Sequence, residues 1–284
     1  MVAQLIKRIL MKYLILTFTG LALTAANGTV TIAADNFDSL GAGVNMDAST
    51  DWQAKWDGAQ TTQRNLYKGD GAGGVTLDTT VAFLNYHALH QTGFTVDATQ
   101  PKATVSLSMT YTHEAGGNAT VVNKALFGPM ISTTANWWNG ANDTFSLSNR
   151  GGAIGNTVAG APFIEGWNQH SALGINTTTG GTSVPITIAW DLTSNGATID
   201  AQATYSYGST SFTSTKVDTG VAIGTTIYGG FSTAWNDQGN TTALSSFSKI
   251  SSVGVDDFSI VAVPEPSSVA LSALSALGLL KRRR

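Results

Sequence analysis

The chain has 284 residues, of which 12% are charged, with 31 glycines, 6 prolines and no cysteine. Between residues 35 and 262, 17 acidic and 8 basic side chains give a net charge of −9. This charge argues against a nucleic-acid partner or an anionic lipid surface, because both are bound through clustered Lys and Arg. The absence of cysteine excludes a disulfide framework.

The N-terminal segment has the order of a secretory signal peptide, with charged, then apolar, then small residues. Basic residues between 7 and 12 precede an apolar run over 13–23, and small residues follow up to Ala26. We expect a signal helix at residues 1–26 that engages Sec-type export machinery. An uncleaved anchor helix is the alternative, disfavoured because the run is shorter than the ~20 residues that a membrane span needs. The sequence leaves open the start, at Met1 or Met11, and the cleavage point, after Ala26 or Ala34.

Alternating apolar and polar residues predict strands through the middle of the chain. The clearest alternation runs from Val105 to Tyr111 and from Val184 to Leu192, and a less regular one runs from Val75 to Phe83. Because no long segment between 35 and 262 shows a helical stripe, we predict an all-β domain. Shorter strands are expected at 145–147, 226–228 and 258–261.

The segment from 184 to 207 predicts a hairpin. Its apolar residues alternate up to Leu192, and the alternation resumes at Ile199 after the dipeptide Asn195-Gly196. Asn-Gly tolerates the positive φ angles of a type I′ turn. We therefore expect a tight turn at this dipeptide, with Trp190 facing the core.

Together these strands predict one antiparallel β-sandwich or jelly roll at residues 27–262. The hairpin from Ile186 to Tyr207 and the strand from Val255 to Ile260 resemble those of laminin-G and concanavalin-like jelly rolls. We expect this β-domain to be flanked by an N-terminal signal helix and a C-terminal transmembrane helix.

Candidate catalytic groups are sparse. A glycoside hydrolase needs two carboxylates on either side of the scissile bond. The domain has two glutamates, Glu114 and Glu165, and neither lies in an alternating Glu-x-Asp-x-Glu strand. We therefore expect no catalytic residue, and a polysaccharide-acting hydrolase or lyase is the less favoured alternative.

Metal-binding patterns are also weak. His87 and His90 have helical i, i+3 spacing, which would bring two imidazoles to one metal, but no Glu or Cys stands near them. The oxygen-rich segment 236–240 and the pair Asp256-Asp257 suit Ca²⁺ better. Since Asn, Asp and Gly are also ordinary turn residues, we expect no cofactor, with Ca²⁺ as the alternative.

Three tryptophans beside amide side chains are candidates for glycan stacking: Trp137, Trp138 and Trp167. On a strand, adjacent side chains face opposite ways, whereas a loop leaves both free to be exposed. An exposed indole with a neighbouring amide holds a sugar ring by stacking and hydrogen bonds. The expected small partner is therefore a neutral polysaccharide, and packing on the core is the alternative role.

The C-terminal segment, residues 263–284, has three parts. The first part is an acidic linker, Val263, Pro264, Glu265 and Pro266, which the two prolines keep extended. The apolar stretch that follows is only marginally long enough to span a bilayer as a helix, and its leucines are Leu271, Leu274, Leu277, Leu279 and Leu280. The third part is a basic end, Lys281, Arg282, Arg283 and Arg284, which we expect to hold the C-terminus of the helix in the cytoplasm.

This order of linker, apolar helix and basic end resembles the PEP-CTERM sorting signal. The resemblance implies that an exosortase-like membrane protease-transpeptidase recognises Pro264, Glu265 and Pro266 and that the helix is discarded after transient inner-membrane anchoring. In families with this tail, such proteins are associated with exopolysaccharide and the biofilm matrix. The resemblance therefore implies an exported, non-enzymatic surface or extracellular protein, with a carbohydrate-binding module as the first alternative.

Overall fold

The computed structural model describes residues 28–56, 67–78, 80, 85–113, 125–135, 146–150, 153–155, 164–165, 182–235 and 250–265. The expected signal helix at 1–26 and the expected transmembrane helix after Pro266 lie outside these residues. Within the described ranges, no helix is both long enough and apolar enough to cross a membrane.

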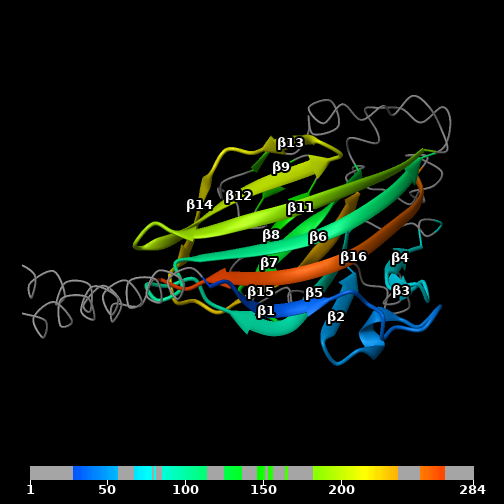
Figure 1. Cartoon of the computed structure of the whole chain (residues 1–284), viewed down its shortest axis with the longest axis horizontal. Helices are drawn as coiled ribbons and strands as arrows, with labels where there is room; N and C mark the ends of the chain where they lie inside the picture. The colour runs from blue at the N-terminus through cyan, green and yellow to red at the C-terminus, as the bar shows by residue number, and fades with distance from the viewer. Residues whose placement is uncertain are drawn as a thin grey trace, which may run out of the picture.

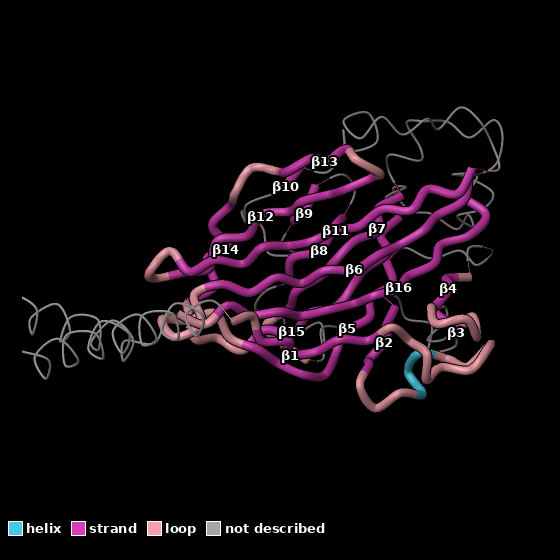
Figure 2. Tube along the Cα trace, in the orientation of Figure 1, coloured by secondary structure: helices cyan, strands magenta, loops and turns pink. Residues whose placement is uncertain are grey.

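The described strands form two antiparallel sheets, which lie face to face (Figure 1, Figure 2). Sheet A contains nine strands. Its main path runs through β13 (Thr210–Thr213), β12 (Thr198–Tyr207), β11 (Thr182–Ser194), β6 (Lys102–His113), β16 (Ile250–Val263), β4 (Val75–Leu77) and β3 (Tyr67–Gly69). Off this path, β16 pairs with β1 (Val30–Asp35), and β12 pairs with β14 (Val217–Ala222).

Sheet B contains seven strands and lies behind sheet A in the view of Figure 1. Its strands follow the order β10 (Ile164–Glu165), β9 (Ala153–Gly155), β8 (Ser146–Arg150), β7 (Ala125–Ser132), β15 (Ile227–Trp235), β5 (Asn85–Phe94) and β2 (Trp52–Trp56). The one helical element within the described ranges is a single 3-10 turn, η1 (Met46–Ala48). The prediction of an all-β domain is thus confirmed for the part of the chain that the structure describes.

The strands expected from alternation are present where the structure describes them. The two regular alternations lie in β6 and β11, and the strand expected at 258–261 lies within the second half of β16. The less regular alternation from Val75 forms β4 only as far as Leu77, and residues 79 and 81–84 lie outside the described residues. Of the short strands expected at 145–147 and 226–228, the first corresponds to the start of β8 at Ser146, with residue 145 outside the described residues, and the second to the start of β15 at Ile227.

The core lies between the sheets because alternate residues of each strand point inward. Val105, Trp190 and Ile260 of sheet A are fully buried and belong to the same hydrophobic cluster as Phe231 of sheet B. Gly229 of β15 marks a close approach of the two sheets. A Cβ at this position would lie 3.1 Å from the Ile260 side chain and 3.2 Å from that of Val105.

Strands β11 and β12 form the predicted hairpin. Their register places Trp190 opposite Ala203 and Ser194 opposite Ile199. Trp190 is 0% exposed, which confirms that it faces the core. Its indole N–H has no hydrogen-bond partner among the described residues.

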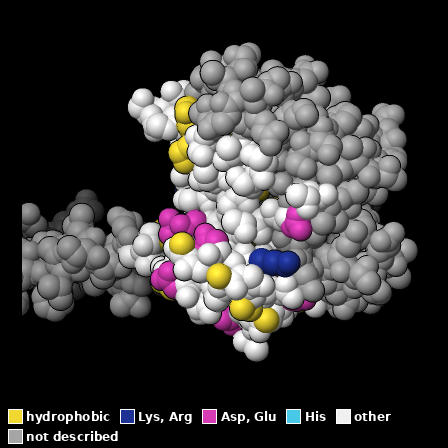
Figure 3. All heavy atoms as spheres, turned by 90° about the vertical axis from the view of Figure 1, so that its right-hand side faces the viewer, with side chains coloured by type: hydrophobic (Ala, Val, Ile, Leu, Met, Phe, Trp, Pro, Cys, Tyr) yellow, Lys and Arg dark blue, Asp and Glu magenta, His cyan; other side chains and the backbone are white. Residues whose placement is uncertain are grey.

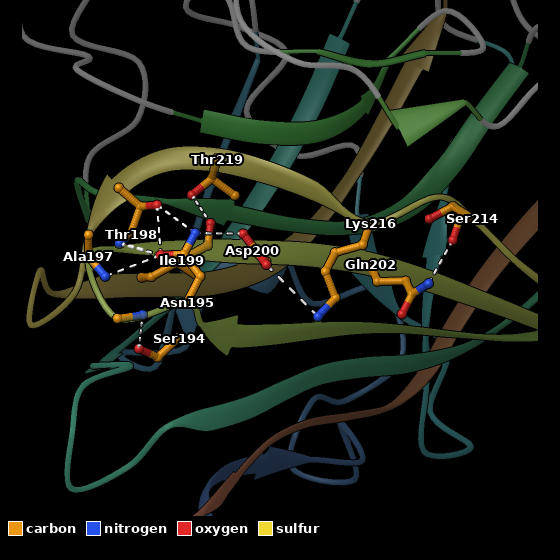
Figure 4. Close-up of polar contacts among 11 residues, drawn as sticks. Ser194, Asn195, Ala197, Thr198, Ile199, Asp200, Gln202, Ser214, Lys216 and Thr219 are labelled. Carbon is orange, nitrogen blue, oxygen red and sulfur yellow. Dashed lines mark hydrogen bonds and ion pairs between the residues drawn. The ribbon is translucent and has the colours of Figure 1, made fainter.

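The turn of this hairpin is not the expected type I′ turn. Gly196 has a φ of 101°, but Asn195 does not have a positive φ, and a type I′ turn needs both. A single glycine at the first central position fits a type II′ turn. The Asn195 side chain instead bonds to the start of β12, since it accepts from the N–H of Thr198 and donates to the Asp200 carboxylate, each at 2.9 Å (Figure 4). Lys216 pairs with the same carboxylate at 3.9 Å.

The first and last strands bring the two ends of the domain together. Val30 of β1 lies opposite Ala262 of β16, and the other side of β16 pairs with β6, where Val263 lies opposite Lys102. In Figure 1, β1 begins and β16 ends at the left-hand end of the sandwich. The polypeptide therefore enters and leaves the domain at neighbouring points of the same end.

Candidate functional site

The described part of the predicted sorting motif follows directly on the last strand. Val263 ends β16, Pro264 is half-buried, and Glu265 is exposed. The backbone N–H of Glu265 donates a hydrogen bond of 3.0 Å to the carbonyl oxygen of Thr99. Because proline also fixes its own φ, the first two residues of the tripeptide are attached to the sandwich. The carboxylate between the two prolines is left accessible.

A tight turn before β6 holds the Thr99 carbonyl in place. The Asp97 carboxylate accepts hydrogen bonds from the Thr99 hydroxyl at 2.7 Å, the Thr99 N–H at 2.7 Å and the Gln100 N–H at 2.9 Å. These bonds, that of the Thr99 hydroxyl first, lower the pKa of Asp97 to about 2. The carboxylate is therefore ionised at neutral pH, and its bonds stabilise the turn on which Glu265 is docked.

Most of the other predicted site residues lie outside the described residues. They are Pro266, the leucines from 271 to 280, the basic end at 281–284, and Trp137, Trp138 and Trp167. The same holds for the oxygen-rich segment 236–240 and for Glu114, whereas Glu165 lies in β10. Anchoring, glycan stacking and calcium binding at these positions stay predictions.

His87 and His90 do not form the helical pair that their spacing suggested. Both lie in the strand β5, whose backbone does not have the helical turn that would bring residues three apart together. The ring of His90 packs against those of Trp52 and Phe258, at centroid distances of 5.1 Å and 5.8 Å. Its Nδ1 accepts the N–H of Thr92 at 3.2 Å. Burial lowers the pKa of His90, so this imidazole is a neutral packing group at pH 7.

An aromatic cluster surrounds Trp52, at residues that no sequence pattern singled out. The Trp52 ring lies 5.5 Å from that of Phe37 and 5.4 Å from that of Phe231. Its indole N–H donates to the Asp35 carboxylate at 2.6 Å, and this carboxylate also accepts the N–H of Phe37 at 2.6 Å. These contacts hold Phe37 at a φ of 56°. No local pattern signals the cluster, because its members come from β1 and the turn after it, from β2 and from β15.

A pocket of about 460 Å³ lies on the outer face of sheet A. Sheet residues that point away from the core form its floor, and the segment 70–74 lines one side. The polar and glycine residues of the floor come from four neighbouring strands and are Gly254 and Asp256 of β16, Ser108 and Thr110 of β6, Thr187 of β11, and Ser206 of β12. This volume falls in the range of about 300–1,000 Å³ typical of small-molecule sites.

Strand register aligns four floor residues in one line, which we call the polar row. Asp256 lies opposite Ser108, Ser108 opposite Thr187, and Thr187 opposite Ser206. Since neighbouring strands are about 4.8 Å apart, the polar row is about 14 Å long. It consists of three hydroxyls with one carboxylate at its end.

Carboxylates gather at the Asp256 end of the polar row. Burial raises the pKa of Asp256, and the negative charges of Asp257, Asp70 and Asp38 raise it further. Strand β16 has a bulge directly after Asp256, in which Asp257 has a φ of 50°. Figure 3 shows carboxylates spread over a largely uncharged described surface at the β3–β4 end. No group of three or more His, Cys, Asp or Glu side chains in the described ranges is arranged to hold a metal ion, so Ca²⁺ at Asp256-Asp257 stays a prediction.

The similarity of this chain to known proteins is specific only at the tail. No curated protein matches the chain in sequence. Solved structures to which the chain is similar include the Lotus tetragonolobus seed lectin, with 11% identity and a TM-score of 0.45 over 84% of this chain and 100% of that chain. An endo-1,3-beta-glucanase from Streptomyces sioyaensis has 11% identity and a TM-score of 0.43 over 83% of this chain and 96% of that chain.

An alginate lyase from Aplysia kurodai has 11% identity and a TM-score of 0.43, over 81% of this chain and 98% of that chain.

The tail is matched more specifically. Residues 262–284 match the PEP-CTERM protein-sorting motif, which confirms the prediction made from the order of linker, apolar stretch and basic end. The chain therefore carries a PEP-CTERM protein-sorting motif, which begins at the last residues of strand β16.

Proposed function

We propose that this protein is a non-enzymatic β-sandwich that is delivered to the cell surface or the extracellular matrix after exosortase-type processing of its tail. The observation that carries the proposal is the PEP-CTERM motif at residues 262–284. This motif implies an exported protein with a C-terminal, membrane-anchored sorting signal and a matching processing system. Delivery to the surface or matrix and the absence of catalysis are the parts that we add.

The position of the motif on the domain supports processing of a folded substrate. Glu265 is exposed at the end of β16, one residue after Pro264. Its backbone is docked on the Thr99 carbonyl, so the carboxylate is presented from a defined place on the sandwich. A membrane enzyme that reads this carboxylate between two prolines can therefore do so without unfolding the domain.

The pairing of β1 with β16 supports a defined orientation at the membrane. Because Val30 lies opposite Ala262, the segments before residue 28 and after residue 265 leave from the same end of the sandwich. If both segments engage the membrane, this end faces the bilayer. The polar row crosses β6 at Ser108, six residues beyond Lys102, which places it about 20 Å farther from that end.

The proposal of a non-enzymatic role rests on the sequence. Apart from Glu265 in the tail, the chain has two glutamates, and neither belongs to an alternating acidic strand of the kind that jelly-roll hydrolases use. A hydrolase or lyase needs an acid and a base or nucleophile held on either side of one bond. The protein purified from the producing cell should therefore show no depolymerising activity toward polysaccharides.

The sorting route is tested by replacing the tripeptide in the full-length protein. In Pro264→Ala/Glu265→Ala/Pro266→Ala, export should proceed, but the unprocessed form should accumulate in the inner membrane. Fractionation and intact-mass analysis would show a species that retains the tail, whereas the unaltered protein should be recovered without it.

The matched control replaces three consecutive exposed residues at the β12–β13 turn, in Ser209→Ala/Thr210→Ala/Ser211→Ala. This variant should be processed like the unaltered protein. Normal release of the tripeptide variant, with its tail removed at the usual place, would contradict recognition of the tripeptide. Intact mass of the unaltered protein also fixes the N-terminal cleavage point and any attached glycan.

A further inference from the structure

We propose that the pocket on the outer face of sheet A binds a segment of polysaccharide that carries free amino groups. The binding site is the polar row together with Asp70 on the neighbouring loop. This inference goes beyond the export route and does not depend on it, because it concerns the folded domain alone.

The hydroxyls of the polar row are available to a ligand. Elsewhere on the same face, polar side chains bond to each other across strands, as Ser106 does with Ser259 at 2.8 Å and Thr104 with Asp191 at 2.6 Å. Within the described part of the chain, no such bond occupies the hydroxyls of Ser108, Thr187 or Ser206, although each points outward from its strand. A polyhydroxylated ligand can both donate to these hydroxyls and accept from them.

The charge of the pocket selects a cationic group. Asp70 and Asp256 line the pocket, and the ion pairs found within the described ranges lie elsewhere, at Lys102–Asp191 and Lys216–Asp200. A ligand ammonium would relieve the repulsion between the two carboxylates and form charge-assisted hydrogen bonds with them. Uronic or sulfated polymers would add negative charge to the pocket and are disfavoured for the same reason.

The Asp70 carboxylate is held in place before any ligand arrives. Its Oδ1 accepts the N–H of Ala72 at 2.6 Å and that of Gly74 at 3.0 Å. The Oδ2 of Asp70 lies close to Gly74, since a Cβ added to this glycine would be 2.9 Å from that oxygen. The loop therefore positions a carboxylate at the side of the pocket, and binding does not have to order this side chain.

The shape of the pocket favours a chain segment over a small cation. The polar row crosses four strands, and the pocket volume is about 460 Å³, more than a single ammonium ion fills. No aromatic side chain is among the described residues that line it. Recognition here therefore relies on hydrogen bonds and charge, unlike the stacking expected of the three tryptophans.

The test uses the protein as its own cell produces and processes it, purified in that form. Glucosamine oligomers are the probe, N-acetylglucosamine oligomers of the same length are the uncharged comparison, and calorimetry measures the dissociation constant. We expect the glucosamine oligomers to bind, the acetylated oligomers to bind at least about tenfold more weakly, and binding to weaken at high salt.

Two variants probe the site by independent means. Asp256→Asn removes one carboxylate and should weaken binding about tenfold or more. Gly254→Leu places a side chain on the pocket floor, where the added Cβ would be 3.8 Å from the nearest atom, an ordinary contact. This variant should lose binding while its thermal unfolding midpoint stays close to that of the unaltered protein.

The matched control is Asp191→Asn, which makes the same charge change on the same face, at a carboxylate bonded to Thr104 outside the pocket. It should leave the dissociation constant unchanged. Equal binding of the acetylated oligomers, full binding by a folded Gly254→Leu variant, or an equal loss in Asp191→Asn would each overturn the proposal. So would binding that disappears on removal of Ca²⁺, because a metal ion would then be the recognised cation.

Discussion

Replacing Trp190 with alanine should lower the free energy of unfolding by about 3–5 kcal/mol. Trp190 is 0% exposed and lies in β11 between Val105 of β6 and Ala203 of β12. A buried aromatic side chain removes about 150–250 Å² from water, which at about 25 cal/mol per Å² amounts to an upper value of about 4–6 kcal/mol. Since domains are stable by about 5–15 kcal/mol, this one change removes a large share.

Trp190→Phe separates the loss of ring area from the loss of the indole N–H. Because this N–H has no partner among the described residues, its removal costs little, and we expect a loss below about 2 kcal/mol. Urea unfolding followed by far-ultraviolet circular dichroism measures both variants, with the exposed Thr215→Ala within about 0.5 kcal/mol of the unaltered protein as control. A loss below about 1 kcal/mol in Trp190→Ala would refute the inward orientation of this face of the hairpin.

Three further predictions concern His90, the Asp97 turn and the tryptophans. Because the pKa of His90 is lowered in the folded protein, the unfolded chain takes up the imidazole proton at a higher pH than the folded one. The free energy of unfolding should therefore fall as pH drops below about 6.5, and His90→Phe should reduce this fall. With its pKa at about 2, Asp97 should contribute stability above about pH 4 that is lost toward pH 2. Asp97→Ala should also speed hydrogen exchange at the Glu265 amide, which mass spectrometry measures. Unchanged exchange would contradict the docking of Glu265 on the Thr99 carbonyl. Neutral polysaccharide bound through Trp137 and Trp138 should be retained at high salt on an affinity gel and lost in Trp137→Ala/Trp138→Ala; unchanged retention in this variant would assign the indoles to packing.

Local patterns predicted the elements whose cause is local. Alternation identified β6, β11 and β12 because each strand buries every second residue, and Trp190 faces the core for the same reason. The turn at Asn195-Gly196 was located correctly, but its type was not. The Asn195 side chain bonds to the first residue of β12, which no dipeptide preference reveals, and only Gly196 takes a positive φ.

The histidines show how a local reading goes wrong. His87 and His90 have a spacing that places two side chains together on a helix but on opposite faces of a strand. Their segment is the strand β5, because its partners β2 and β15 lie on either side of it in sheet B. Pairing with distant segments thus decided between helix and strand, and the spacing of the two histidines carries no information about that pairing.

The sequence by itself determined the strands β6, β11 and β12, the inward face of the hairpin and the sorting motif at residues 262–284, because each depends on the order of neighbouring residues. Only the tertiary structure decided the polar row, the docking of Glu265 on the Thr99 carbonyl and the joining of the two chain ends. The physical reason is register. A strand places alternate residues on its outer face, but pairing with other strands decides which of those residues become neighbours.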